Sequence, residues 1–275
     1  MREIGLFSLY SGSAGNAFLV AVRGRCFLID AGKSARALCA AIRCCGHEPG
    51  EIEAVFVTHE HNDHISALPC FLKQHPVPVH LPADCAYRLA GDPWVAERLQ
   101  PHGPGEEVWL GDIRIVSFPT PHDSRGSVGY RVEIPTAGGR FCLGYATDIG
   151  YVTREVEQCL TGCQAVVLES NHDPDMLRQG PYPAFLKRRI ASRQGHLSNP
   201  ESAGLAARLC AAGTRSLMLA HLSPENNTPD TAYSECLGCV ADAAVTVCVA
   251  QPDRVTELPA EFRTDSRREN MPCCI

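Results

Sequence analysis

The stretch Ala54-Val55-Phe56-Val57-Thr58-His59-Glu60-His61-Asn62-Asp63-His64 joins an apolar run to the pattern H-x-H-x-D-H. The apolar run predicts a buried strand that ends in a loop. Side chains two residues apart share a face, so His59 and His61 point the same way, while the following turn swings Asp63 and His64 toward a second position. The motif therefore predicts a metal site that can supply ligands to two ions.

The ligand types in this motif indicate which metals it suits. Imidazole nitrogen and carboxylate oxygen suit Zn²⁺, and also Mn²⁺ or Fe, whereas a structural zinc site more often recruits thiolates. We therefore expect a catalytic site with room for water. The alternative is a polar surface loop that happens to be rich in histidine, which is how an isolated histidine would be interpreted.

Length and composition indicate a globular protein. The chain has 275 residues, of which 45% are hydrophobic and 20% charged, enough for a sizeable core. We predict a single domain over residues 1–262 and a frayed tail over 263–275. No stretch reaches about 18 uninterrupted apolar residues, and the first residues lack the apolar segment of a signal peptide. We therefore expect a cytoplasmic protein without a membrane partner.

The 15 cysteines are scattered singly or in pairs, unlike the disulfide frameworks of small secreted proteins. We expect most to be reduced and several to serve as small core residues. Cys236 and Cys239 form a C-x-x-C with no second pair. Because this segment is predicted to be a helix, positions three apart would both face the core, so we interpret the pair as structural.

A local basic run stands out against a net charge of −6, which argues against attraction of nucleic acid to the whole surface. Lys187, Arg188, Arg189 and Arg193 lie within seven residues that contain no acid. Such a run is ordinarily a solvated helix face. Because it precedes His196, we predict that it lies beside the active site and binds phosphate groups.

Short apolar segments alternate with helical stretches in both halves of the chain. The predicted strands are residues 4–8, 17–22, 25–29, 53–57, 107–118, 127–134, 140–146, 165–169, 216–220 and 245–250. The predicted helices are residues 34–45, 65–74, 153–159, 182–192, 200–212 and 230–240. This repeated arrangement predicts an α+β fold, a four-layer αββα sandwich of two mixed sheets flanked by helices.

Three further candidate ligands each follow a strand-like segment. His122 follows residues 113–118, Asp148 follows the predicted strand that ends at residue 146, and His221 follows the one that ends at residue 220. Loops at one edge of a sheet are where a rigid scaffold collects catalytic groups. Taken singly, each histidine would be interpreted as a hydrogen-bonded loop residue, but the ordered set points to a shared site.

With these residues in place, the chain resembles the metallo-β-lactamase fold metallohydrolases, whose signature is H-x-H-x-D-H followed by a His, an Asp and a final His. The resemblance covers nearly the whole chain and implies two divalent metal ions per chain, Zn²⁺ or Mn²⁺, with Fe as a further option. It implies that the first metal is bound by His59, His61 and His122. It implies that the second is bound by Asp63, His64 and His221, with Asp148 bridging the two.

A narrower likeness is to the YycJ/WalJ branch of that superfamily. It depends on four segments: residues 11–16, 169–173, 195–199 and 221–227. The branch implies a 5′-to-3′ exonuclease that takes DNA as its substrate. Too few residues separate Asp148 from His221 for the large cap domain of many RNA-cleaving relatives. A substrate clamp must therefore be small or come from a second subunit, which would make the protein a homodimer.

The implied chemistry is in-line attack on phosphorus by a hydroxide held between the two metals, since coordination lowers the pKa of water. We predict Asp63, Asp148 and His196 as the catalytic residues. His196 would protonate the leaving 3′ oxygen or hydrogen-bond the phosphate, because the ligand set is complete without it. The alternative is that His196 only neighbours a helix cap formed by Ser198 or Asn199.

Three further residues are predicted around the substrate. Ser13 and Asn16 lie in a Gly/Ser-rich segment whose backbone N–H groups would bind an anion, although a plain tight turn explains the segment equally well. His172 is expected to orient a metal ligand through its ring or to lie near the substrate.

Two other functions compete with a nuclease. The same metals act on thioesters, lactones or β-lactams in related enzymes, but these substrates have little use for His196 and the basic run. A noncatalytic metal-binding regulatory protein would not need the complete ligand set. The sequence therefore favours a metal-dependent phosphodiesterase that acts on nucleic acid.

Overall fold

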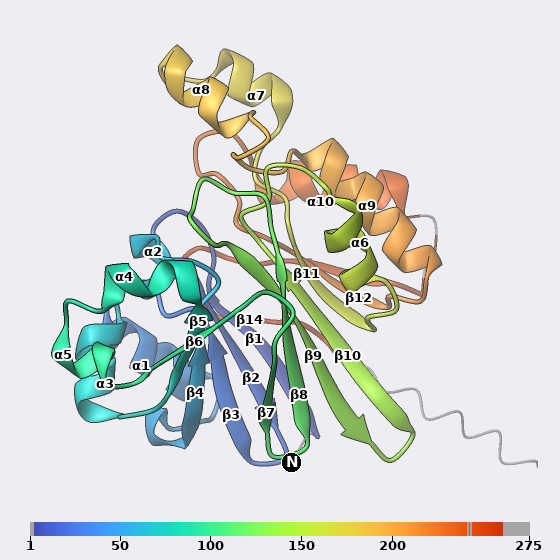
Figure 1. The fold of residues 1–275 in the computed structure, drawn as a ribbon. Coiled ribbons are helices and arrows are strands. Elements are labelled where there is room, and N and C mark those ends of the chain that lie inside the picture. Colours follow the sequence, from blue (N-terminus) through green and yellow to red (C-terminus); the bar gives the residue numbers. More distant parts are fainter. Residues whose placement is uncertain (1–2, 241, 243, 261–275) are drawn as a thin grey trace, which may run out of the picture.

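The computed structural model describes residues 3–240, 242 and 244–260; the predicted tail over 263–275 lies outside these residues. Two sheets pack face to face, and helices cover their outer sides (Figure 1). Each sheet has seven strands. No helix in the described part of the chain is long and apolar enough to cross a membrane.

The first sheet has the strand order β14-β1-β2-β3-β4-β5-β6. Its strands are β1 (Ile4–Tyr10), β2 (Ala17–Val22), β3 (Arg25–Ile29), β4 (Ile52–Phe56), β5 (Val79–Pro82), β6 (Leu99–His102) and β14 (Thr256–Glu257). The helical elements of this half are α1 (Ala35–Cys44), η1 (Pro49–Glu51), α2 (Asn62–Ile65), α3 (Leu68–Gln74), η2 (Ala83–Cys85), α4 (Ala86–Leu89) and α5 (Pro93–Ala96).

The second sheet has the order β13-β12-β11-β10-β9-β8-β7. Its strands are β7 (Glu107–Leu110), β8 (Ile113–Pro119), β9 (Val128–Thr136), β10 (Gly139–Ala146), β11 (Ala165–Glu169), β12 (Ser216–Ala220) and β13 (Thr246–Val249). The helices of this half are α6 (Arg154–Leu160), α7 (Pro174–Gln179), α8 (Ala184–Ile190), α9 (Asn199–Ala211) and α10 (Pro229–Cys239).

Three hydrophobic cores separate the four layers. The central core joins the facing sides of the two sheets, with Phe18, Phe56 and Tyr145 among its members. A second core lies between the first sheet and α1 and α3, and a third between the second sheet and α6, α9 and α10. Burial of these apolar faces is the main stabilising term of the fold. The predicted αββα sandwich of two mixed sheets is confirmed.

Several predicted elements differ in detail from the observed ones. The predicted strand over residues 107–118 is two strands, because Gly111 adopts φ +60° and turns the chain between β7 and β8. The predicted helix over 65–74 is divided into α2 and α3. Cys236 is buried, but Cys239 is exposed, so the prediction that both face the core was wrong for Cys239. The elements α5, β6, α7 and β14 are short and were not predicted.

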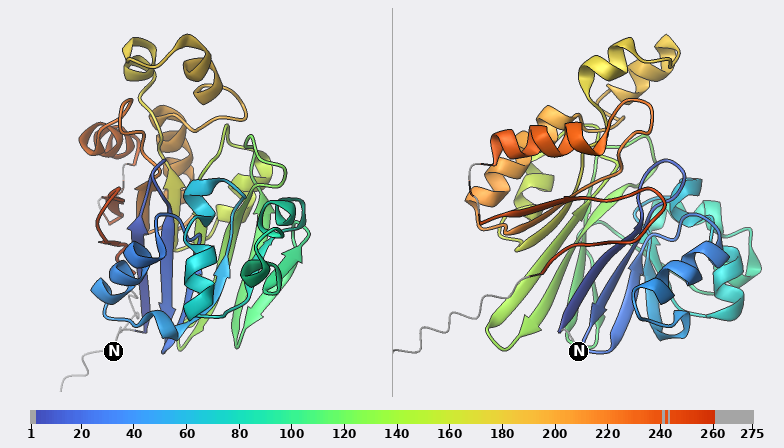
Figure 2. Two further views of the ribbon diagram at one scale, coloured as in Figure 1. Left: turned by 90° about the vertical axis from the view of Figure 1, so that its left-hand side faces the viewer. Right: turned by 180° about the vertical axis from the view of Figure 1, so that it is seen from behind.

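The candidate residues gather where strands of the two sheets end. His59 lies shortly after β4, His122 after β8, Asp148 after β10 and His221 after β12. Strands β10, β11, β12 and β13 run parallel, so their carboxyl ends meet at one edge, where the ligands of α/β sheets are commonly bound. The short helices α7 and α8 stand beyond that edge, set apart from the other helices (Figure 2).

Candidate metal centre

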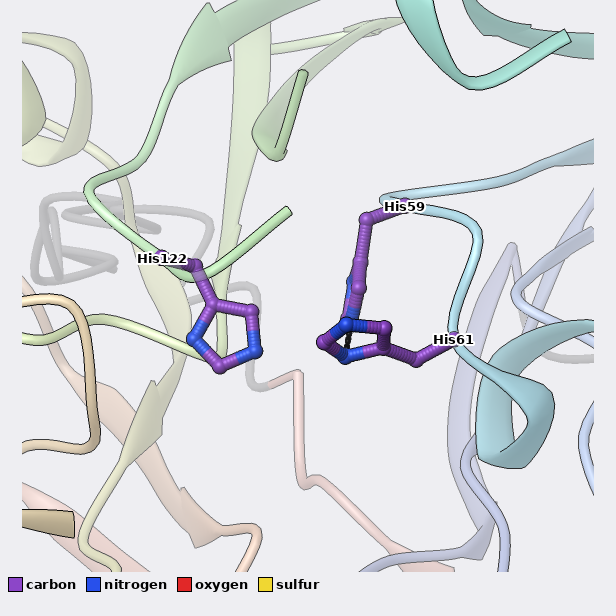
Figure 3. Close-up of side chains that lie close together, drawn as sticks. All are labelled: His59, His61 and His122. Atoms are coloured by element: carbon purple, nitrogen blue, oxygen red, sulfur yellow. Dashed lines mark hydrogen bonds between the residues drawn. The ribbon is translucent and has the colours of Figure 1, made fainter. Parts of the chain in front are cut away.

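The first group of candidate ligands combines two loops. His59 and His61 follow β4, whereas His122 follows β8, and the rings face one another across a small gap (Figure 3). One nitrogen of each ring lies within 4.8 Å of the others. The centroid of the His122 ring is 5.0 Å from that of His59 and 5.1 Å from that of His61. The three imidazoles can therefore bind one ion.

The second group brings Asp63, His64 and His221 together, again with ligand atoms within 4.8 Å of one another. Asp148 lies between the two groups. Its Oδ2 is 3.4 Å from Nε2 of His64, and its Oδ1 is 3.7 Å from Nε2 of His122. A carboxylate that reaches one ring of each group is placed to bridge two metals.

Two buried carboxylates orient rings of the centre from behind. Asp30 accepts a hydrogen bond from Nδ1 of His64 at 2.8 Å, and Glu169 accepts one from Nδ1 of His221 at 2.9 Å. Nδ1 of His122 donates to the carbonyl oxygen of Gly195 at 3.1 Å. Because Nδ1 holds the proton in each of these rings, Nε2 offers its lone pair to the centre.

The charges of the centre fall into two sets. Burial and the neighbouring charges of His64 and His122 lower the pKa of His59 well below its usual range, so this ring stays neutral and able to bind a metal. Burial alone would also lower the pKa of His221, but Asp148, Asp63 and Glu169 raise it to about 10. The carboxylates around His221 therefore favour positive charge, which divalent cations supply.

The backbone at the centre is strained at three positions. Asp30, Asp148 and His221 have φ values of +61°, +56° and +58°, a region that side chains other than glycine rarely adopt. Each of these residues lies within two positions of a strand end, after β3, β10 and β12 respectively. Such strain costs about 1–3 kcal/mol per residue and concentrates at functional sites. It turns each side chain back toward the centre.

Unpaired polar atoms test whether the centre fits metal ions. Oδ2 of Asp148 and Nε2 of His221 are buried and have no hydrogen-bond partner among the described residues. Buried polar atoms without partners are costly, and nearly all find one. Both atoms face the space between the ligand groups, so a bound cation would satisfy them. The donor set of imidazole and carboxylate suits Zn²⁺ or Mn²⁺.

The first hairpin supports the second group of ligands. Asn16 is buried, and its Nδ2 donates to Oδ2 of Asp63 at 3.2 Å and lies 3.0 Å from Nε2 of His64. Gly12 N donates to Oδ1 of Asn16 at 2.8 Å, which fixes the amide in this orientation. A Cβ at Gly32 would lie 2.0 Å from the carbonyl oxygen of Asp63, so this close approach requires glycine.

A cavity of about 300 Å³ adjoins the centre under α8. Of the residues predicted around the substrate, Ser13, Arg189 and His196 line it. Nδ1 of His196 is held by Oε1 of Glu169 at 2.8 Å. Ser198 caps α9 together with Glu201, so the helix cap and the ring of His196 are separate features.

The other predicted substrate residues lie elsewhere. Nζ of Lys187 donates to the carbonyl oxygen of Arg178 at 2.8 Å, and the guanidinium of Arg193 lies 3.9 Å from the centroid of the Tyr151 ring. Arg188 is exposed. His172 is buried, and its Nδ1 has no hydrogen-bond partner within the described chain. Together with Asn16, these residues are absent from the described lining of the cavity under α8.

Sequence reasoning missed three acidic residues of the site. Asp30 and Glu169 orient histidines, and Asp123 lies 3.2 Å from Nε2 of His122 while it accepts a hydrogen bond from Arg189 at 2.5 Å. A weak signal exists for two of them. Asp30 and Glu169 each stand at the end of an apolar strand segment, where a carboxylate is expected to have a buried cationic or hydrogen-bonded partner.

The known proteins most relevant to this geometry are nucleases and a fold relative. A family model described as a beta-lactamase superfamily domain matches residues 25–222. Exodeoxyribonuclease YycJ of Bacillus anthracis is 33% identical over 227 residues, which span 82% of this chain and 84% of that protein. Exodeoxyribonuclease WalJ of Streptococcus pneumoniae is 31% identical over 270 residues, which span 94% of this chain and 99% of that protein.

A solved structure shares the fold. The metallo-beta-lactamase fold protein YhfI of Bacillus subtilis superposes with a TM-score of 0.72 at 17% identity, over 93% of this chain and 100% of that one. The predicted resemblance is thereby confirmed. The chain belongs to the beta-lactamase superfamily as a YycJ/WalJ-like metal-dependent hydrolase of the metallo-beta-lactamase fold.

Proposed function

We propose that this protein is a 5′-to-3′ exonuclease that hydrolyses DNA with two divalent metal ions, Zn²⁺ or Mn²⁺, or alternatively Fe. The two relatives that span most of the chain are named exodeoxyribonucleases, which supports DNA as the substrate. In this proposal the first ion is bound by His59, His61 and His122. The second is bound by Asp63, His64 and His221, and Asp148 bridges the two.

The bound ions would lower the pKa of water and neutralise charge on the phosphate. The residues of the chain have separate tasks. Asp30 and Glu169 orient rings toward the ions, while Asp63 and Asp148 supply the carboxylate oxygens. His196 protonates the 3′ oxygen as it leaves phosphorus.

One observation carries the proposal: His196 lies against the ligand cluster without being needed in it. Its Nδ1 is held by Glu169 at 2.8 Å, and the ring lines the cavity beside the centre. The centroid of the ring is 5.2 Å from that of His122. A hydrolase of activated acyl groups has little need of such a group, whereas a phosphodiesterase must protonate a poor leaving group.

The proposed contacts with the substrate depend on exposure and charge. Ser13 and Arg189 line the cavity and would bind phosphate oxygens. Arg188 and Arg193 are exposed near it and would contribute to the attraction of DNA. Lys187 belongs to the same basic run. Asn16 and His172, both buried, are proposed to act by positioning other groups rather than by touching the substrate.

The small clamp expected from the sequence is proposed to be α7 and α8. Tyr182 and Leu186 of this segment line the cavity together with Ile190, and both helices stand above the sheet edge (Figure 2). The chain would then cover its own site. A homodimer and a cytoplasmic location remain predictions.

The proposal is tested with purified protein reconstituted separately with Zn²⁺ and with Mn²⁺. The substrates are 5′-phosphorylated duplex DNA, single-stranded DNA, RNA of the same sequence and a thioester, with the nucleic-acid products resolved by length. We expect mononucleotides released from the 5′ end of DNA. Asp148→Ala serves as the matched control that identifies contaminating nuclease. Hydrolysis of the thioester without cleavage of DNA would contradict the proposal.

A further inference from the structure

The ligand cluster lies between two hollows. One is the cavity of about 300 Å³ under α8. The other is a more spacious hollow of about 620 Å³ that extends toward α4. Both hollows are lined by His61, His122 and Asp123. A polymer whose phosphodiester sits at the metal centre would therefore pass from one hollow into the other.

The hollow beside α4 presents positive charge and an aromatic ring. Tyr87, Arg88 and Arg125 line it, and all three are exposed. The guanidinium of Arg125 lies 4.3 Å from the centroid of the Tyr87 ring. Bases stack on aromatic rings and on guanidinium planes, while the guanidinium also attracts phosphate. This combination is suited to a single strand of nucleic acid.

The two arginines of this hollow are free to bind an anion. Neither Arg88 nor Arg125 has a carboxylate within ion-pair distance in the described part of the chain; Arg88 donates to the amide oxygen of Asn62 at 3.2 Å. In the cavity under α8, by contrast, Arg189 is already paired with Asp123. The uncompensated positive charge next to the metal centre therefore lies on the α4 side.

Glu60 holds both walls of this hollow against the metal loop. It stands between His59 and His61, and its carboxylate accepts hydrogen bonds from Oγ of Ser124 at 2.6 Å and from Sγ of Cys85 at 2.8 Å. Ser124 precedes Arg125, and Cys85 leads directly into α4, which carries Tyr87 and Arg88. The position of the hollow is thereby fixed relative to the ligands.

We propose that Tyr87, Arg88 and Arg125 bind the DNA strand that remains after each cleavage, while the cavity under α8 receives the departing 5′-terminal nucleotide. This inference rests on the proposed exonuclease function. It names a subsite that sets how the polymer lies across the metal centre. We call the hollow lined by these three residues the strand hollow.

The direction of the strand follows from the place of His196. In 5′-to-3′ hydrolysis, a bond forms between the water oxygen and phosphorus, and the bond from phosphorus to O3′ of the terminal nucleotide breaks. O3′ leaves as a hydroxyl with the proton from His196, a water proton restores the ring, and the shortened strand keeps the phosphate at its new 5′ end. His196 lines the cavity under α8 and not the described part of the strand hollow. The departing nucleotide therefore belongs under α8.

The volume of the cavity agrees with this direction. About 300 Å³ is at the lower end of the range for sites that take one small molecule. The strand hollow has about twice that volume and continues along exposed residues. A single nucleotide fits the first and a continuing strand fits the second.

The test compares a long and a short substrate on the double variant Arg88→Ala/Arg125→Ala. The long substrate is a 5′-phosphorylated single strand of about 20 nucleotides, and the short one is a 5′-phosphorylated dinucleotide, which does not reach far into the strand hollow. We expect the ratio of kcat/KM for the long to the short substrate to fall about tenfold or more. Binding of the long strand in EDTA, followed by fluorescence anisotropy, should show a salt-dependence slope smaller by about 1.4, since each neutralised phosphate contributes about 0.7 for single strands.

The matched control is Arg140→Ala, which removes one positive charge at the start of β10, the end of the strand opposite to Asp148. It should leave the ratio unchanged. Tyr87→Leu should lower the ratio, and Tyr87→Phe should restore it, because stacking needs the ring and not the hydroxyl.

Each other outcome separates the inference from the proposed function. An equal loss on both substrates, or an unchanged ratio with an unchanged salt slope, would overturn the strand hollow. A wild-type protein that hydrolyses the dinucleotide but gains nothing from a longer strand would overturn it as well. A wild-type protein that cleaves neither substrate but hydrolyses the thioester would instead overturn the exonuclease function itself.

Discussion

The two groups of candidate ligands are built in different ways. His59, His61, Asp63 and His64 come from one short stretch between β4 and the end of α2. His122, Asp148 and His221 come from three loops, each after a different strand of the second sheet. The first stretch is compact because neighbouring residues supply it. The second set requires that three loops far apart in the chain meet at one edge.

Both halves nevertheless use the same device. A buried carboxylate from the adjacent sheet receives Nδ1 of a histidine and leaves Nε2 for the metal, Asp30 for His64 and Glu169 for His221. The difference is that Glu169 also receives Nδ1 of His196, whereas Asp30 receives Thr58. One carboxylate therefore serves binding alone, and the other joins binding to the proposed proton donor.

The largest expected effect comes from the residue between the two groups. Asp148→Ala should abolish hydrolysis and reduce the bound metal, because its two oxygens face both groups. Metal content by mass spectrometry and activity are measured on the same sample. Full activity with two bound metals in this variant would disprove the bridging assignment.

His196→Ala tests whether the second half holds a proton donor. We expect metal content to be retained and DNA cleavage to slow by about 10²–10⁴-fold, the usual contribution of a general acid. A phosphodiester with a good leaving group, such as a nitrophenyl ester, should be slowed much less. Equal losses on both substrates would argue that the ring only orders the site.

Glu169→Gln and Asp30→Asn compare the two carboxylates directly. Loss of such partners of metal ligands typically costs about 10–100-fold in metal affinity or activity. We expect both variants to bind metal more weakly in a titration. At saturating metal, Asp30→Asn should recover most of its kcat, while Glu169→Gln should not, because His196 also loses its partner. Equal recovery would remove the distinction between the two halves.

The basic run gives a smaller effect, on binding rather than chemistry. Neutralising Lys187, Arg188 and Arg189 should flatten the salt dependence of binding to duplex DNA by about 0.9 for each phosphate that the variant no longer neutralises. Because Arg189 is paired with Asp123 and Lys187 with a carbonyl, Arg188→Ala alone should account for most of the change. An unchanged slope would leave the run as ordinary surface.

The smallest effect concerns a histidine outside both groups. Burial, with a further contribution from His102, lowers the pKa of His80 to about 4, whereas an unfolded chain has about 6.5. The unfolded state therefore binds more protons between these values, so the stability from neutral His80 is complete above about pH 6.5 and is lost as the pH falls toward 4.

His80→Gln should lessen this acid sensitivity. Urea unfolding of the protein in EDTA, at pH 7.5 and pH 5, should show a difference in unfolding free energy that is smaller than in the wild type by about 1 kcal/mol or less, after allowance for solvent screening. His75→Gln is the matched control. An unchanged difference would show that His80 is not the titrating group.

The predictable parts of the fold were those with local patterns. Residues 17–22, 25–29, 165–169 and 216–220 were predicted with the same bounds that the structure has, because each is a short apolar run between turn residues. The strand over 107–118 was not divided correctly, since only the positive φ of Gly111 marks the turn. Elements as short as β14 and α5 carry too few residues to form a pattern.

The sequence by itself determined the family, the ligand types and the expectation of a shared edge, because H-x-H-x-D-H is contiguous and each later ligand directly follows an apolar strand. Only the tertiary structure decided which buried carboxylate stands behind which ring, that Asn16 supports Asp63, and that Arg88 and Arg125 share a hollow with the metal loop. Those relations join residues that lie far apart in the chain. They depend on how two sheets pack, which no local pattern encodes.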